Sequence, residues 1–225
     1  MTINKIKNLN NEIENLKRKL KIREYHADKG IVRLIIGEMH RQEREATWPI
    51  LEEFKPKPLK GSVIIVPTVD LKGKTNISVI NPKYLETSAY KTYCKILEHY
   101  KPDIVVELHA FNPKSYQSLT NSHRLEKKNV PPLVPYIEEP LIEDQVLHGG
   151  PPPYAKNKFK EHGSYVTLEI SRNYTEKAKK TLLNILNIIV KSNSPQEIIS
   201  KLTEMYPESM KKARELLYKY LKTTL

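Results

Sequence analysis

The chain has 225 residues, 39% hydrophobic and 28% charged, a balance that excludes a disordered chain and fits one globular domain with a helical appendage. Lysine and arginine number 38 against 26 acidic residues. The net charge of +12 is only weak support for nucleic-acid binding, because the excess is spread along the chain. A single cysteine, Cys94, excludes a disulfide framework and a cysteine-based metal cluster. No apolar run approaches the roughly eighteen residues of a membrane span, so we expect no membrane partner and a reducing cytoplasmic compartment.

The predicted elements begin with an amphipathic helix. Apolar residues recur at spacings of three and four over residues 4–22, without the continuous apolar segment of a secretory signal. Short β-branched runs predict buried strands at 31–36 and 63–66. Between them the pattern predicts a helix that begins near Glu43 and kinks or restarts at Pro49.

The second half of the chain is interrupted by a proline-rich stretch, 111–153, which predicts a long loop with at most one short strand. The other predicted elements of this half are a helix at 84–100, strands at 104–108 and 165–170, a helix at 175–191, and helices with Pro195 and Pro207 in their first turns.

Alternating strands and helices predict a doubly wound α/β fold, whose mostly parallel or mixed sheet is covered by helices. We expect three parts: an N-terminal amphipathic helix at 1–24, an α/β metallohydrolase-like domain at 25–192, and a C-terminal helical extension at 193–225 that packs on it. The apolar stripe of the first helix can pack on the domain or on a second copy, so a homodimer stays open.

Candidate metal ligands follow the predicted strands, at the edge where open α/β sheets bind ligands. His40 and Glu43 follow the first strand, His109 ends the third, and Glu169 lies near the end of the fourth. Two histidines and one glutamate are a standard protein set for a hydrolytic zinc ion that leaves one position for water. We therefore predict one Zn²⁺ per chain on His40, Glu43 and His109. Glu169 is the candidate base that accepts the proton of the metal-activated water.

Each of these residues also has an ordinary structural explanation. An H-x-x-E pair is often a surface pair on a helix, and His109 can be a hydrogen-bonded core histidine. Glu169 has apolar neighbours and is costly to bury unpaired, so an ion pair with Arg172 or a lysine is the structural alternative. His148 and Tyr154, in or beside the proline-rich stretch, are weaker candidates for the wall of a pocket.

Three strings resemble motifs of zinc carboxypeptidase relatives, closest to the succinylglutamate desuccinylase and aspartoacylase branch. IIGEMHRQE resembles the metal motif G-x-x-H-G-x-E, VVELHA the segment with the second histidine, and SYVTLEIS the segment with the catalytic glutamate. The layout, including VLHGGPPPYA, is also similar to an uncharacterised archaeal family of that superfamily. The resemblance covers residues 31 to about 190. It implies amide-bond hydrolysis, zinc on His40, Glu43 and His109, and Glu169 as general base and acid.

The chain departs from that pattern in three places. Arg41 replaces the glycine after the first histidine, and Glu107 replaces the aspartate before the second. The branch's N-R pair, which grips the substrate carboxylate, has no arginine here beside Asn81. Four arginines can supply the missing charge from other directions: Arg41, Arg44, Arg124 and Arg172.

The predicted function is a zinc-dependent hydrolase that cleaves an amide or peptide-like bond in a small-molecule or peptide-like substrate. The alternative is a non-catalytic relative that keeps the fold as a binding or scaffold protein, which the missing arginine and the basic surface favour. Nucleic-acid binding through that surface is a third option, and it predicts binding that falls steeply with salt.

Overall fold

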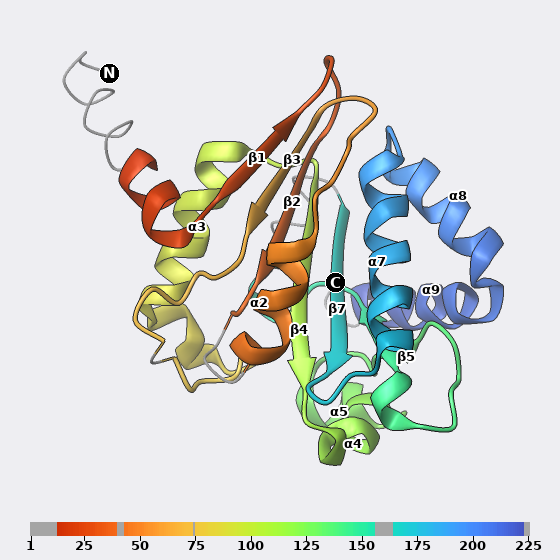
Figure 1. Ribbon diagram of the computed structural model, residues 1–225. Helices are drawn as coiled ribbons and strands as arrows, with labels where there is room; N and C mark the ends of the chain where they lie inside the picture. The colour runs from red at the N-terminus through yellow and green to blue at the C-terminus, as the bar shows by residue number, and fades with distance from the viewer. Residues whose placement is uncertain (1–12, 40–42, 74, 156–163, 223–225) are drawn as a thin grey trace.

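The computed structural model describes residues 13–39, 43–73, 75–155 and 164–222, which form a mixed seven-stranded sheet with helices on both faces (Figure 1). The strands are β1 Arg23–His26, β2 Val32–Gly37, β3 Ser62–Val66, β4 Ile104–Phe111, β5 Val134–Pro135, β6 Val146–Gly149 and β7 Ser164–Ser171. Their order is β1-β3-β2-β4-β7-β6-β5. The four central strands are parallel, whereas β1, β5 and β6 pair antiparallel at the two edges. The predicted α/β fold is confirmed, with a mixed sheet.

Helices cover the two faces of the sheet unequally. The longer ones are α2 Arg44–Glu53, α3 Ser88–Tyr100, α7 Glu176–Lys191, α8 Pro195–Met205 and α9 Pro207–Lys222, and the shorter ones α4 Tyr116–Thr120 and α5 Arg124–Lys128. Short 3₁₀ turns are η2 Pro82–Glu86, η3 Pro113–Ser115, η4 Ile142–Asp144 and η5 Pro153–Ala155. Residues 13–20 are also helical. α2, α7 and α8 share one core with the sheet, and α3 packs on the opposite face (Figure 1).

Several predicted boundaries are wrong for identifiable reasons. β1 carries no apolar run that would mark a strand. α2 continues through Pro49 instead of restarting there. The helix expected from residue 84 begins at Ser88, because the preceding residues form the separate turn η2 and the Thr87 side chain caps α3. The stretch 111–153 contains two short helices and two short strands rather than at most one strand.

The sheet register brings the predicted site residues to one edge. β4 and β7 are parallel neighbours, and His109 lies opposite Glu169 in their register. Strand alternation turns both side chains away from the α7 face, toward which Leu108 and Leu168 point. The next neighbour, β2, ends at Gly37. A Cβ there would lie 2.6 Å from Leu51 Cδ1 and 3.0 Å from the Pro67 carbonyl oxygen, so this crowded turn into the metal motif favours glycine.

The C-terminal helices pack against the sheet rather than standing apart from it. Ile198, Leu202 and Tyr206 share the core of α7, and the Ser209 hydroxyl donates to the Pro135 carbonyl at 2.6 Å. Within the described ranges, no helix has the length and apolar character that a bilayer crossing needs. The division of the chain near residues 24 and 192 stays a prediction.

Candidate metal and catalytic site

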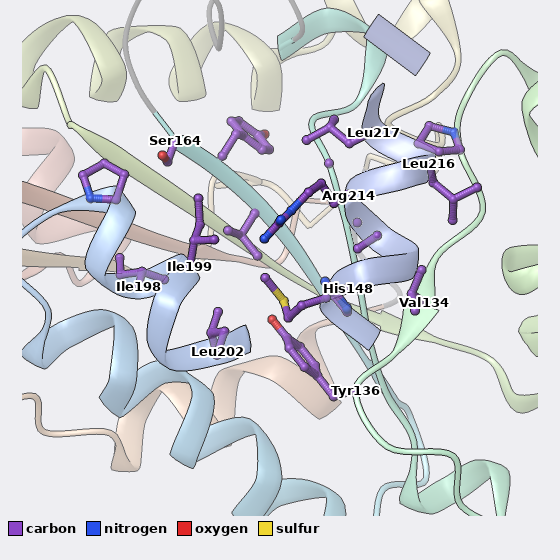
Figure 2. A pocket seen from close by; sticks show the side chains of 18 of the residues that line it. Val134, Tyr136, His148, Ser164, Ile198, Ile199, Leu202, Arg214, Leu216 and Leu217 are labelled. Carbon is purple, nitrogen blue, oxygen red and sulfur yellow. The ribbon is translucent and has the colours of Figure 1, made fainter. Parts of the chain in front are cut away.

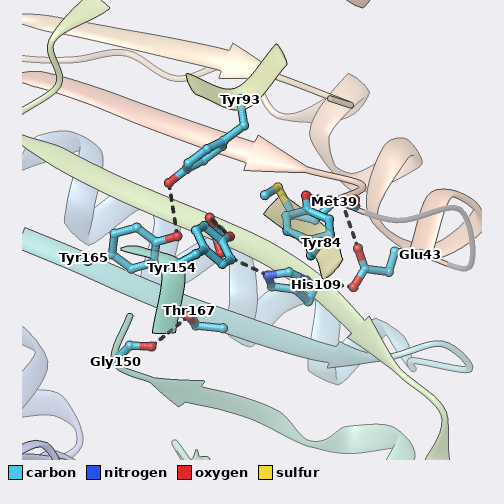
Figure 3. Close-up of polar contacts among 10 residues, drawn as sticks. Met39, Glu43, Tyr84, Tyr93, His109, Gly150, Tyr154, Tyr165 and Thr167 are labelled. Atoms are coloured by element: carbon cyan, nitrogen blue, oxygen red, sulfur yellow. Dashed lines mark hydrogen bonds and ion pairs between the residues drawn. The ribbon is translucent and has the colours of Figure 1, made fainter. Parts of the chain in front are cut away.

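Three of the four predicted site residues lie in the described part of the chain, and His40 lies outside it. Glu43 immediately precedes α2, while His109 and Glu169 stand side by side on β4 and β7. The carboxylate Oε1 of Glu43 lies 2.8 Å from Nδ1 of His109 (Figure 3). The structure therefore joins the H-x-x-E segment to the second histidine, 66 positions later in the chain.

The Glu43 side chain is held from two directions. Its Oε2 accepts a hydrogen bond of 3.0 Å from the backbone N–H of Met39, and only 1% of the residue is exposed. The Tyr84 hydroxyl donates to the Met39 carbonyl at 3.2 Å, which fixes the same turn from the α3 side (Figure 3). Glu43 is thus folded back toward the sheet and leaves Oε1 directed at His109.

His109 is buried between two carboxylates. Nδ1 faces Glu43, and Nε2 lies 3.3 Å from Oε2 of Glu107. Burial alone lowers the pKa of His109, but the charges of Glu43 and Glu107 outweigh it and raise the pKa well above its usual value. The surroundings of this imidazole therefore favour a positive charge, from a proton or from a metal ion.

The donors at this point suit a zinc ion. An imidazole nitrogen and a carboxylate oxygen that lie 2.8 Å apart can both reach one Zn²⁺, since zinc binds each at about 2.0–2.2 Å. No group of three or more His, Cys, Asp and Glu side chains within the described ranges is placed to hold a metal. Glu43 and His109 thus form two thirds of the predicted ligand set.

A small pocket of about 50 Å³ opens beside His109 on the side of Glu169. Its polar lining consists of Glu107, His109, Arg124, Thr167 and Glu169. Its other walls come from residues 79–80, 130–131, 133 and 150–152, four of which are prolines or glycines. The pocket has room for a water molecule next to the histidine and the glutamate.

Glu169 has the properties of a proton acceptor. Burial raises the pKa of its carboxyl to about 7, against the opposing charges of His109, Arg124 and Arg172. The carboxyl lies in the pocket beside His109, where the charges of Arg124 and Arg172 also act on it. A carboxyl with a pKa near 7 can accept and return a proton at neutral pH.

Of the four arginines that the sequence offered as a source of positive charge, Arg124 is the one that lines this pocket in the described part of the chain. It begins α5 and lines the pocket with 9% of its surface exposed. One terminal nitrogen donates to the Pro131 carbonyl at 2.7 Å, while the buried Nε has no partner in the described part of the chain. Arg44, by contrast, is exposed and lies 4.4 Å over the Trp48 ring. The proline-rich stretch shows no periodicity that would place an arginine here.

A second cavity, of about 180 Å³, lies on the other side of the β5–β6 ribbon, under α8 and α9 (Figure 2). Its walls are mainly apolar, with side chains such as Val134, Ile198 and Leu202, and it holds none of the predicted site residues. His148 points into this cavity and not into the pocket beside His109.

His148 provides a pH-dependent test of the fold. Burial lowers the pKa of this imidazole to about 3, and its Nε2 lies 2.7 Å from the Ser209 hydroxyl. In the unfolded chain a histidine has a pKa of about 6.5, so acid protonates the unfolded state first and favours it between pH 6.5 and 3. Relative to His148→Gln, the wild type should therefore lose about 2 kcal/mol of unfolding free energy between pH 7 and 5, measured in urea. A pH-independent difference between the two would contradict a buried neutral imidazole.

The sequence matches a family of uncharacterized proteins conserved in archaea, DUF2119, over residues 28–222. It is 32% identical over 195 residues to the uncharacterized protein MJ0501 of Methanocaldococcus jannaschii, with 85% of this chain and 92% of that protein covered.

Solved structures with a similar chain path include an aspartoacylase family protein from Mesorhizobium loti, with 14% identity and a TM-score of 0.45. A metallo-carboxypeptidase from Burkholderia cenocepacia gives 13% identity and a TM-score of 0.44. These matches cover 77% and 75% of this chain, which spans only 62% and 59% of the two structures.

Proposed function

The chain belongs to the archaeal family DUF2119, and we propose from its own site that it is a zinc-dependent hydrolase of amide or peptide-like bonds. The observation that supports this is the convergence of Glu43, His109 and Glu169 from three separate elements on one edge of the sheet. Their residue types, two carboxylates and an imidazole, are those of a hydrolytic zinc site.

The roles of the residues follow from their chemistry. Glu43 and His109 would hold the ion together with His40. When bound, a divalent cation supplies a water of lowered pKa and a positive charge for the carbonyl oxygen. Glu169 lines the same pocket as His109, accepts the proton of the attacking water on its carboxylate and returns it to the leaving amine. The prolines of the pocket wall restrict access of bulk water to this carboxylate.

Arg124 supports a substrate with an anionic group near the cleaved bond. It is the one lysine or arginine among the described residues that line the pocket, and its buried Nε has no protein partner. Guanidinium groups bind carboxylates through paired hydrogen bonds. A small-molecule or peptide-like substrate with a carboxylate fits this arrangement, with Arg124 in place of the arginine that the N-R pair lacks.

The non-catalytic alternative requires ordinary structural partners for the same groups. Glu169 instead lines the pocket beside His109, with the pKa of its carboxyl raised to about 7. A hydrolase uses such a carboxyl to accept and return a proton, whereas a scaffold protein does not require one. The site therefore favours the enzyme.

Metal analysis tests the proposal. Protein purified without added metal should contain about one zinc ion per chain, and His40→Ala should lose it, because two remaining ligands hold zinc too weakly. His26→Ala is the matched control, since His26 is exposed on β1 and pairs with Ser62. Wild-type protein without bound metal, or His40→Ala with full metal content, would contradict the ligand assignment.

A further inference from the structure

The segment VLHGGPPPYA carries a tyrosine that reaches the back of the proposed metal site. The Tyr154 hydroxyl donates to Oε1 of Glu107 at 2.6 Å, and the other oxygen of Glu107 lies 3.3 Å from Nε2 of His109. On its far side, Nδ1 of His109 lies 2.8 Å from Glu43. These contacts connect Tyr154 on the loop, through Glu107 and His109, to Glu43 of the metal motif. Figure 3 shows Tyr154, His109 and Glu43 in this arrangement.

The buried carboxylate of Glu107 depends on these contacts for its hydrogen-bond partners. Glu107 is 0% exposed, and no lysine or arginine forms an ion pair with it in the ranges that the structure describes. A buried carboxylate is costly unless hydrogen bonds or a charge compensate it. One oxygen accepts from Tyr154 and the other faces His109, while Tyr93 and Tyr165 also hydrogen-bond to this carboxylate. Tyr154 makes the short contact of 2.6 Å and so helps to fix the orientation of the carboxylate.

The orientation of Glu107 decides which nitrogen of His109 can bind a metal. A carboxylate next to Nε2 accepts a hydrogen bond from the N–H of the neutral ring. The lone pair is then on Nδ1, where it can bind a metal. Nδ1 is the nitrogen that faces Glu43. A carboxylate that accepts a hydrogen bond from a metal-binding histidine generally fixes the tautomer and orientation of that ring. Residues that hold the carboxylate in place contribute to the same effect.

The loop is built to hold Tyr154 in place. The Tyr154 ring packs against three further tyrosines at centroid distances of 5.5, 5.5 and 5.8 Å, namely Tyr84, Tyr90 and Tyr93. The Thr167 hydroxyl of β7 donates to the Gly150 carbonyl at 3.0 Å (Figure 3), and consecutive prolines restrict the backbone that follows. The hydroxyl is therefore presented to Glu107 at a fixed position.

We propose that Tyr154 is a positioning residue of the metal site, which holds Glu107 so that His109 offers Nδ1 to the ion. This rests on the proposed function, in which His109 and Glu43 are metal ligands. The segment VLHGGPPPYA would then do more than form the wall of the pocket. Through Glu107 and His109, its tyrosine would set the affinity of the site for zinc.

Zinc affinity of the full chain, measured by competition with a chromophoric chelator, tests this role. Tyr154→Phe keeps the ring packing and removes only the hydroxyl, and it should weaken zinc binding by about 10- to 100-fold, as the loss of such an outer partner does. Tyr90→Phe is the matched control. It removes a hydroxyl from the same cluster of rings, and no hydrogen bond joins Tyr90 to Glu107 in the described part of the chain.

A double-mutant cycle separates positioning from general stability. Glu107→Gln should also weaken zinc binding, and adding Tyr154→Phe to that variant should have no further effect, because the hydroxyl acts through Glu107. Urea unfolding of the metal-free proteins shows whether each variant is folded. A tyrosine with a purely structural role would lower stability and leave zinc affinity unchanged in the folded fraction.

The outcomes distinguish this inference from the proposed function. If the wild type binds no zinc, the proposed function fails. If the wild type and Tyr154→Phe bind zinc equally, only the role of Tyr154 is overturned. Should Tyr154→Phe not fold, nitrogen chemical shifts of His109 in the zinc-loaded wild type decide instead: protonation at Nε2 is expected, and zinc on Nε2 would contradict the inference.

Discussion

Replacement of Glu169 by glutamine is expected to lower kcat/KM by about 100- to 10,000-fold while the zinc content stays at that of the wild type. Glutamine has nearly the same shape but cannot accept the proton of the attacking water. The carboxyl lines the pocket beside His109, and burial raises its pKa to about 7. The measurement is hydrolysis of a panel of N-acetylated amino acids and short peptides, with metal analysis of the same preparations.

Glu126→Gln is the control for this loss. Glu126 lies on α5 near the same pocket, but it is exposed and pairs only with His123 in the described ranges. Its replacement should leave both hydrolysis and zinc content unchanged. Full activity in Glu169→Gln would assign the base to another residue, and hydrolysis of no member of the panel by the wild type would contradict the proposed reaction.

Replacement of Arg124 by methionine is expected to lower kcat/KM by about 100- to 1,000-fold for substrates with a carboxylate next to the cleaved bond. The buried guanidinium is the positive side chain of the described pocket lining, and its Nε has no protein partner. For matched amide substrates without the carboxylate, the same change should have little effect. The comparison of the two substrate classes is the measurement.

Lys128→Met controls for the loss of one positive charge from α5. Lys128 ends the same helix and is exposed, so its replacement should leave hydrolysis of both substrate classes unchanged. Equal losses for charged and uncharged substrates in Arg124→Met would indicate a structural role for the arginine. No loss at all would place the anion-binding group elsewhere.

The sheet could be predicted because its central strands are short, mostly apolar runs between helical patterns. What the sequence could not specify is which strands lie side by side. The contact between His109 and Glu169 depends on the parallel pairing of β4 with β7, which the chain completes only after the long stretch 111–153. The sequence placed candidate side chains at the ends of strands. The register between β4 and β7 is what makes His109 and Glu169 neighbours.

The remainder of the site depends on side-chain geometry that has no signature in the sequence. Arg124 and Tyr154 both come from segments where turns and prolines hide any periodicity. Glu107 was recognisable only as a departure from an aspartate, yet the longer side chain still reaches Nε2 of His109 at 3.3 Å. Such contacts follow from how the loops fold over the sheet, which local patterns do not determine.

The central claim, that distant residues of this chain converge to hold a metal ion, is tested most directly by anomalous scattering at the zinc edge from crystals of the protein. We expect one peak per chain at about 2.0–2.2 Å from both Nδ1 of His109 and Oε1 of Glu43, with His40 as the third protein ligand. No peak at this position, with Glu43 and His109 in direct contact in zinc-soaked crystals, would contradict the account.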